Sequence, residues 1–567
     1  MARTVAIGVQ DFVKLIEQNC FYIDKTSFIK EWWENKDDVT LITRPRRFGK
    51  TLNMSMMESF FSVKYAEKRS IFEGLSIWKD EKYRKMQGTY PVISLSFANV
   101  KETTYSNTMK KFNQILTDLY NKNDFLLDGD LLTDKEKEYF QSVTWDMDAV
   151  TAAASLHHLS NYLNKYYGKK VIILLDEYDT PMQEAYVNGF WDELTAFMRS
   201  LFNAAFKTNP YLERAIMTGI TRVAKESIFS DLNNLKVVTT TSDAYATAFG
   251  FTEEEVFAAL DEYGMKNRNE VKKWYDGFIF GKVRDIYNPW SIINLLDTGK
   301  INTYWANTSA NSLVGRLIRE GSSDIKIKFE ELLRGKSIVS EIDEEIVYDQ
   351  LGKKKDAVWS LLLASGYLKV VRYETYEQLR GTRRRRPRYE LALTNLEVQF
   401  MFEEMICGWF DDGDTEAYND FIKALFLGDV KAMNTYMNRV ALNTFSCFDT
   451  GRRPSGAEPE RFYHGFVLGL MVELADRYTI TSNRESGFGR YDVLLEPVDN
   501  KDSAVILEFK VFDPEEEETL ADTVKKALAQ IEEKQYAANL AAKGFAEERI
   551  RKYGFAFKGK EVLIGEG

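Results

Sequence analysis

Apolar residues in the first part of the chain occur in short continuous runs separated by stretches with helical spacing. The clearest run is Val171–Leu175, which ends in Asp176 and Glu177. Such a run suits a strand that is buried on both faces of a parallel sheet. The same alternation continues in three more expected strands and two expected helices: Val39–Thr43, Tyr90–Phe97, Arg214–Gly219, Asn107–Tyr120 and Trp191–Phe206. We therefore expect a three-layer α/β domain over residues 1–250.

From about Phe251 the spacing becomes mainly helical. Thr252 followed by three glutamates predicts a helix start, because a capping hydroxyl and first-turn acids both stabilise that end. Trp274–Gly277 and Tyr287–Ser291 read as packing turns. We expect residues 251–455 to form a mainly helical lid or linker domain, interrupted by strands at Tyr367–Tyr373 and Arg388–Leu393.

A basic run, Arg383-Arg384-Arg385-Arg386-Pro387-Arg388, lies between those two expected strands. It is either a solvated hairpin tip or a contact for a phosphate backbone.

The chain from residue 456 shows a third pattern. A helix is expected through Phe462, Phe466, Leu470 and Leu474, followed by strands and one further helix. The strands are expected at Tyr491–Leu495, Ala504–Val511, Tyr553–Lys558 and Glu561–Ile564, and the helix at Leu520–Ala538. This order predicts a compact α/β/α domain over residues 456–567.

Composition and charge limit the classes of function that fit this chain. The 567 residues carry a formal net charge of -11, which argues against a generally basic nucleic-acid coat but allows a local basic channel. Three widely spaced cysteines and three histidines imply neither a disulfide framework nor a zinc site. No apolar run approaches membrane-spanning length, so we expect a cytoplasmic protein without membrane association.

The segment Arg44–Leu52 has the layout of a phosphate-binding loop. A strand leads into it, and Gly49-Lys50-Thr51 opens the next helix. In such a loop a glycine allows the tight turn, a lysine neutralises the β- and γ-phosphates, and a threonine hydroxyl binds Mg²⁺. Arg44 stands where the general pattern has its first glycine, and Pro45 restrains it to extended conformations. Arg46 and Arg47 are further candidates for contact with the nucleotide.

The strand ends supply the remaining candidates for this site. We expect Asp176 to hold the metal, Glu177 to polarise an attacking water, and Thr218 and Arg222 to contact the γ-phosphate. Ligands of open α/β sheets bind at the carboxyl ends of the strands, where these residues fall. The alternative is that Asp176 and Glu177 cap a turn and that Gly-Lys-Thr is coincidental.

A second group of charged residues lies in the C-terminal part. Glu508 and Lys510 occupy one face of an otherwise apolar strand, and Asp492 lies in the preceding strand. Charges in such a strand are costly unless they are paired or bind a metal. Asp492 and Glu508 are candidate Mg²⁺ ligands, and Glu460 or a nearby acid is a candidate to complete the metal shell. Lys510 is a candidate to orient or deprotonate the attacking water, and Gln530 and Tyr536 are candidates to position the lysine or the substrate. The alternative is a simple Glu508–Lys510 ion pair.

These motifs together resemble a bacterial family with an N-terminal AAA-ATPase-like domain and a C-terminal PD-(D/E)XK nuclease-like domain. The resemblance rests on Tyr22–Thr26, Arg44–Thr51, Leu175–Asp179, Thr218–Arg222, Phe462–Phe466, Ser482–Gly487, Gly489–Asp492 and Ile506–Lys510. It implies an α/β chain with an AAA-like P-loop NTPase domain and a restriction-endonuclease-like domain. It also implies that Arg44 is the family's own form of the loop.

Three functions are therefore open. The first is an ATP-regulated, Mg²⁺-dependent nuclease acting on DNA or RNA, with defence against foreign DNA as a hypothesis for its role. The second is a nucleotide-controlled switch that binds nucleic acid or protein without cutting it. The third is a kinase-like or signalling NTPase assembled as a homo-oligomer.

Overall fold

The computed structural model describes residues 2–222, 228–229, 231–305, 312–319, 323–333, 335–343, 357–374, 377–378, 386–408, 415–444, 477–486, 489–498, 502–558 and 561–567. The chain divides into two compact units. Unit 1 comprises Met1–Leu313 and Ser337–Val398, and unit 2 comprises Val314–Lys336 and Gln399–Gly567. The expected division into three domains at residues 250 and 455 stays a prediction.

Unit 1 contains a five-stranded parallel sheet with the strand order β2-β3-β4-β1-β5. Its strands are β1 Val39–Thr43, β2 Val92–Ser96, β3 Val171–Asp176, β4 Leu212–Gly219 and β5 Leu235–Val238. The pairing of Thr43 with Gly219 and of Ser96 with Asp176 brings the carboxyl ends of four strands to one edge. The apolar runs in the sequence predicted four of these strands, and β5 was missed.

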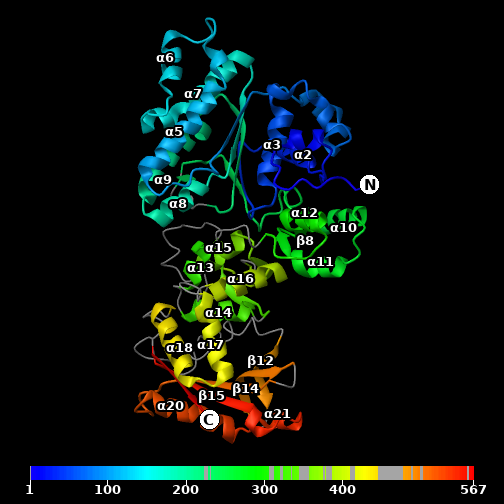
Figure 1. Cartoon of the computed structure of the whole chain (residues 1–567). Coiled ribbons are helices and arrows are strands. Elements are labelled where there is room, and N and C mark those ends of the chain that lie inside the picture. The colour runs from blue at the N-terminus through cyan, green and yellow to red at the C-terminus, as the bar shows by residue number, and fades with distance from the viewer. Residues whose placement is uncertain are drawn as a thin grey trace. The chain divides into compact units, whose positions relative to one another are not determined.

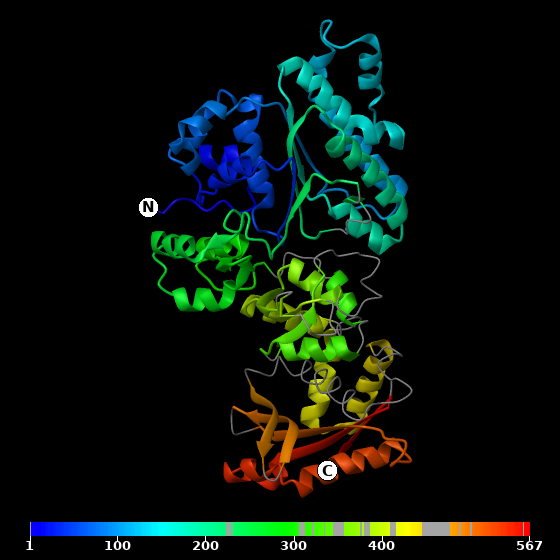
Figure 2. The ribbon, with the colours of Figure 1, turned by 180° about the vertical axis from the view of Figure 1, so that it is seen from behind.

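Helices cover both faces of this sheet, as Figures 1 and 2 show: α2 and α3 lie on one side, and α5, α7 and α9 lie on the other. The helices of this region are α1 Phe12–Glu17, α2 Ser27–Asn35, α3 Lys50–Phe61, α4 Glu81–Met86, α5 Tyr105–Asn121, α6 Asp134–Ser142, α7 Ala149–Tyr167, α8 Thr180–Asn188 and α9 Trp191–Phe202. Buried Leu156, Leu159 and Leu163 follow the helical period on α7. The predicted three-layer α/β arrangement is confirmed.

A smaller module follows in unit 1. Helices α10 Glu253–Glu262, α11 Arg268–Tyr275 and α12 Pro289–Thr298 enclose a sheet with the order β6-β8-β7. Its strands are β6 Phe251–Thr252, β7 Phe278–Phe280 and β8 Val283–Tyr287. A capping box between Thr252 and Glu255 starts α10, as its sequence predicts.

The last part of unit 1 forms a three-stranded antiparallel sheet beside α15 Ala357–Ala364. Its strand order is β10-β11-β9, with β9 Ile338–Glu341, β10 Leu368–Tyr373 and β11 Arg388–Leu393. The sequence predicted β10 and β11 but not β9, which alternates between buried and less buried positions over only four residues.

Unit 2 is built on a sheet with the order β12-β13-β14-β15-β16, in which only the β14–β15 pair is parallel. The strands are β12 Tyr478–Ser486, β13 Gly489–Pro497, β14 Ala504–Val511, β15 Ile550–Lys558 and β16 Glu561–Glu566. The described helices that fall wholly or mainly in this unit are α13 Ser312–Arg319, α14 Ser323–Leu333, α16 Leu396–Gly408, α17 Thr415–Leu427, α18 Val430–Thr444, α20 Leu520–Glu533 and α21 Ala538–Ala542.

Alternation along β14 divides the core of unit 2 between two faces. Val505 and Leu507 pack with residues of α17 and α18, whereas Ile506 packs with Ile531 of α20 and Leu540 of α21. The predicted α/β/α layering is therefore present, but α17 and α18 supply one layer. The helix expected through Phe462–Leu474 lies outside the described residues.

Among the described residues, no helix combines the length and the apolar character that a membrane crossing requires.

Candidate functional site

The loop between β1 and α3 has the backbone geometry of an anion site. Gly49 precedes α3 with φ of 78°, a left-handed conformation that glycine adopts without a steric penalty. It has no side chain with which to cap the first amide groups of α3, so those N–H groups are left for a ligand or water. A helix N-terminus of this kind attracts negative charge.

Lys50 is held inside this loop. Its ammonium group donates hydrogen bonds to the carbonyl oxygens of Arg44 at 3.0 Å and Pro45 at 2.8 Å. Burial lowers the pKa of Lys50, while the carboxylates of Glu177, Asp176 and others oppose that shift. The ammonium group therefore contacts the carbonyl oxygens of the loop, with the carboxylates at the end of β3 close enough to favour its charged form.

Asp176 at the end of β3 joins two hydroxyl groups. The Thr51 Oγ1 donates to one carboxylate oxygen at 2.6 Å, and Thr218 of β4 donates to the other. The three side chains come from different elements and meet because the strand ends are level. A hydroxyl and a carboxylate are hard oxygen ligands, so Thr51 and Asp176 fit a Mg²⁺ ion.

Two acids follow Asp176 and differ in what they contact. Glu177 has a φ of 50° and accepts a hydrogen bond from the Thr180 hydroxyl at 3.2 Å. Left-handed backbone at a non-glycine residue is costly and is found at functional sites. Asp179 accepts from the backbone N–H groups of Ile220 and Thr221 at 3.0 and 2.8 Å. It ties β3 to the segment after β4, a role that its sequence position alone did not reveal.

Arg44 points away from the phosphate loop into the protein. Its guanidinium donates to the carbonyl oxygens of Thr239 at 2.7 Å and Thr43 at 2.9 Å, and lies 4.5 Å from the ring centre of Phe280. The side chain is fully buried, and burial lowers its pKa to about 9. Arg44 therefore fastens the loop to the segment after β5, which explains an arginine in place of glycine.

The other arginines of the site diverge. Arg46 is half-buried and reaches Gln183 of α8 at 3.4 Å, and exposed Arg47 lies 4.2 Å from the ring centre of Trp290. Unlike Arg44, neither side chain is fully buried, so both remain candidates for nucleotide contact.

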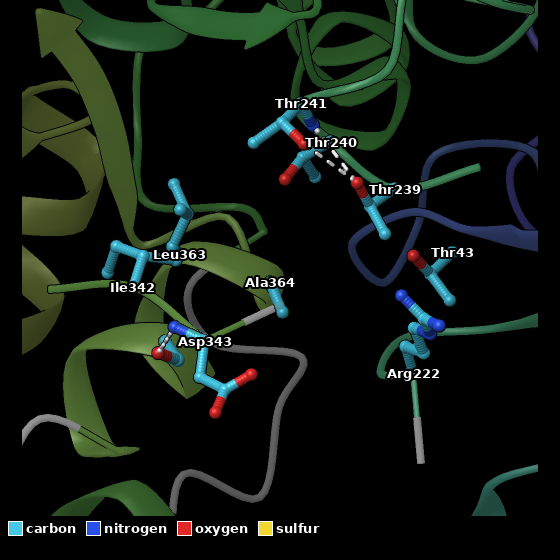
Figure 3. A pocket seen from close by; sticks show the side chains of 10 residues that line it. Thr43, Arg222, Thr239, Thr240, Thr241, Ile342, Asp343, Leu363 and Ala364 are labelled. Carbon is cyan, nitrogen blue, oxygen red and sulfur yellow. Dashed lines mark hydrogen bonds between the residues drawn. The ribbon is translucent and has the colours of Figure 1, made fainter. Parts of the chain in front are cut away.

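Arg222 lines a pocket with Thr43 and Thr239–Thr241. Figure 3 shows Arg222 beside Thr43, with Asp343 on another side of the same pocket. Lys50, Thr51 and Asp176 are not among the described residues that line it. The structure therefore does not bring Arg222 together with Lys50 and the candidate metal ligands, although Arg222 lies beside Thr43 at the start of the loop.

The C-terminal candidates converge in unit 2. The Lys510 ammonium lies 3.8 Å from Glu508, and both project from the same face of β14, as their spacing predicts. Glu508 is buried, whereas the Lys510 side chain is 29% exposed. Asp492 of β13 accepts a hydrogen bond from the Phe509 N–H at 2.8 Å, which brings it beside Glu508. Two carboxylates from neighbouring strands therefore lie side by side, and one of them, that of Glu508, lies next to Lys510.

Helix α20 completes this arrangement. The Gln530 amide donates to Glu508 and also lies 3.0 Å from the Tyr536 hydroxyl. Burial, with Glu508 and Asp492 nearby, raises the pKa of Tyr536. Gln530 thus contacts the carboxylate rather than the lysine. Glu460, the third expected metal ligand, lies outside the described residues.

A third acidic group occurs in unit 1. Glu253, Asp276 and Asp285 have oxygen atoms within 4.8 Å of one another. Lys272 contacts all three, at 3.1 Å from Asp285 and 3.5 Å from Asp276. The ammonium group already supplies the positive charge that a metal would bring, so this is an ion-pair network.

Comparison with known proteins gives matches over both regions. A family model described as predicted AAA-ATPase matches residues 6–229, and one described as PD-(D/E)XK nuclease superfamily matches residues 458–567. The chain is also 24% identical over 408 residues to a protein of Azotobacter chroococcum mcd 1, described as an uncharacterized protein in the vnfD 5'region. That alignment covers 71% of this chain and 70% of the Azotobacter protein.

Proposed function

Since this chain combines an AAA-ATPase-like region with a region of the PD-(D/E)XK nuclease superfamily, we propose that it is an ATP-binding, Mg²⁺-dependent nuclease. The observation that carries the proposal is the meeting of Asp492, Glu508 and Lys510 on two adjacent strands. A buried carboxylate beside a second carboxylate is costly unless a cation or a proton compensates it.

The candidate residues of the C-terminal site have different proposed roles, according to their chemistry. Asp492 and Glu508 offer oxygen ligands for Mg²⁺, with Glu460 as a further candidate. A bound Mg²⁺ would lower the pKa of a water molecule and neutralise charge on a phosphate. The Lys510 ammonium, partly exposed beside Glu508, orients that water and stabilises charge on the scissile phosphate. Gln530 holds the Glu508 carboxylate in place.

Nuclease activity is tested with single- and double-stranded DNA and RNA, with and without Mg²⁺ or Mn²⁺. We expect the wild type to cut at least one substrate only with metal, and Lys510→Ala to lose roughly two to four orders of magnitude in rate. Lys525→Ala is the matched control, since Lys525 is 78% exposed on α20 and pairs with Asp522. Cleavage that is equal in wild type and Lys510→Ala, or absent from both, would reject the nuclease.

The proposed role of the N-terminal site is to bind ATP. Lys50 contacts the outer phosphates, and Thr51 and Asp176 hold the accompanying Mg²⁺. Glu177 is the candidate for polarising an attacking water and so for supporting hydrolysis. Thr218, which donates a hydrogen bond to Asp176, is the candidate for contacting the γ-phosphate. Arg46, Arg47 and Arg222 are the candidates for further phosphate contacts.

ATP binding is measured by titration calorimetry in the presence of Mg²⁺. Lys50→Ala should abolish binding, because it removes the charge that faces the phosphates. Lys64→Ala, which removes an exposed lysine just after α3, should bind as the wild type does. Unchanged affinity in Lys50→Ala would refute the site.

The second candidate function is a nucleotide-controlled switch that binds nucleic acid or protein without cutting it. The charge of -11 and the arginine at the start of the loop favour it. Retained ATP binding together with no Mg²⁺ or Mn²⁺ binding at Asp492 and Glu508 would point to the switch. Defence against foreign DNA is a hypothesis for either activity, tested by challenging cells that carry wild type or Lys510→Ala with phage.

A further inference from the structure

A buried carboxylate lies at the start of α16. Glu397, in the first turn of this helix, is fully buried. One of its oxygens accepts hydrogen bonds from the backbone N–H groups of Tyr304 and Trp305, both at 2.6 Å, and the other accepts from the Ser291 hydroxyl at 2.8 Å. Glu397 therefore fixes the backbone at residues 304–305 and the first turn of α12.

Trp305 carries that connection to the phosphate-binding loop. Its indole N–H donates to the carbonyl oxygen of Arg46 at 3.1 Å. The ring is 1% exposed and packs 5.5 Å from Phe278 and 5.4 Å from Tyr367, measured between ring centres. Since the ring is confined on two sides, the Arg46 carbonyl cannot shift without losing the hydrogen bond or moving Trp305.

A second connection runs in parallel. Ser291, which donates to Glu397, follows Trp290, whose ring faces the guanidinium of Arg47 at 4.2 Å. Two neighbouring residues of the loop are thus joined to one carboxylate through two neighbouring elements, α12 and the segment that contains Trp305.

We propose that Trp305 and Glu397 are positioning residues that couple the phosphate-binding loop to helix α16. Nucleotide at the loop then stabilises the bonds of Arg46 to Trp305 and of residues 304–305 to Glu397, and with them the first turn of α16. The helix begins in unit 1 and continues into unit 2, so its first turn is where a signal from the loop enters the C-terminal part of the chain. The inference rests on the proposed ATP binding.

Hydrogen exchange tests this coupling in the full chain. The N–H groups of Tyr304 and Trp305 are themselves the donors to Glu397, so their exchange reports on the link directly. If ATP with Mg²⁺ stabilises the link by about one net hydrogen bond, exchange at residues 304–305 and in the first turn of α16 slows by roughly fivefold in the wild type.

Trp305→Phe removes the indole N–H but keeps a ring in the pocket. We expect ATP affinity to fall by roughly fivefold and the exchange response at α16 to disappear. Trp32→Phe is the matched control, because it removes another buried indole N–H, 3.3 Å from the Thr40 hydroxyl in the same unit. It should keep both the affinity and the response.

Glu397 is tested by a pair of variants. Glu397→Gln keeps an oxygen for the two N–H groups and an amide that can donate to Ser291, so it should retain the response. Glu397→Ala should lose it, with calorimetry confirming that ATP still binds. ATP binding without an exchange response in the wild type, or a normal response in Trp305→Phe, overturns the coupling and leaves the ATP site standing. No ATP binding in the wild type overturns the proposed ATP function, and the coupling falls with it.

Discussion

Replacing Arg44 by glycine restores the general sequence pattern of a phosphate-binding loop. From the structure, however, we expect this substitution to destabilise the protein. The buried guanidinium binds the carbonyl oxygens of Thr43 and Thr239 at 2.9 and 2.7 Å. Removing it leaves these two acceptors without that donor in a buried region and opens a cavity where a fully buried arginine side chain was packed.

The magnitude follows from those contacts. Each buried acceptor that loses its donor costs about 1–3 kcal/mol, and a new flexible glycine costs about 0.5–1 kcal/mol. Part of this is offset because a cation is no longer buried, a cost reflected in the lowered pKa of Arg44. We expect Arg44→Gly to lower the free energy of unfolding of unit 1 by about 3 kcal/mol and to weaken ATP binding.

Urea unfolding followed by tryptophan fluorescence measures this loss, because nine of the ten tryptophans belong to unit 1. Arg47→Ala is the control: it removes the same charge from the same loop, but Arg47 is exposed and contacts mainly the ring of Trp290. It should cost no more than about 1 kcal/mol. An Arg44→Gly protein that is as stable as the wild type and binds ATP more tightly would refute the reasoning. Arg44 would then have no structural role, and glycine would suit the position better.

Three further predictions concern other parts of the chain. Burial raises the pKa of Asp276 from 3.8 to about 6, so this carboxyl binds a proton more tightly in the folded protein than in the unfolded chain. The stability of the wild type relative to Asp276→Asn should therefore fall as pH rises from 3.8 to about 6. Melting temperatures of the two proteins that change in parallel with pH would contradict this. Gly277 has a φ of 111°, and a Cβ there would overlap the Thr394 carbonyl oxygen. Gly264 also has a positive φ, of 72°, but a Cβ there would meet no other atom, so Gly277→Ala should melt well below Gly264→Ala. Equal melting temperatures would show that the overlap has no effect on stability. Gln530→Ala should reduce metal-dependent cleavage by roughly tenfold or more by releasing the Glu508 carboxylate, with Lys525→Ala again as the control and an unchanged rate as the refuting result.

Local sequence patterns were sufficient for the elements that carry the two sites. β3 is buried along its whole length, so its sequence is a continuous apolar run that ends where Asp176 begins the site. β14 alternates between two packed faces, so Glu508 and Lys510 could be placed on one face from spacing alone. Both inferences need only the spacing of side chains along a strand and the cost of burying a charge, and both can be read from residues that are close together in the sequence.

Partners far along the chain could not be read in this way. The short strands β5 and β9 have too few residues to show a period, and they become strands by pairing with distant segments. Apolar residues of α17 and α18 form one core with Val505 and Leu507 of β14. The sequences of these helices predict that each has an apolar face, but not which sheet that face covers.

The sequence by itself determined that residues Gly49 to Thr51 open a helix after a buried strand, and that carboxylates and a lysine occupy the ends or faces of strands. Only the tertiary structure decided where Arg44 points and what holds the loop. The Trp305–Arg46 hydrogen bond joins residues 259 positions apart, and Arg44 reaches a carbonyl 195 positions away. No local pattern records such contacts, because they exist only once the sheet edge and the surrounding module have folded against each other.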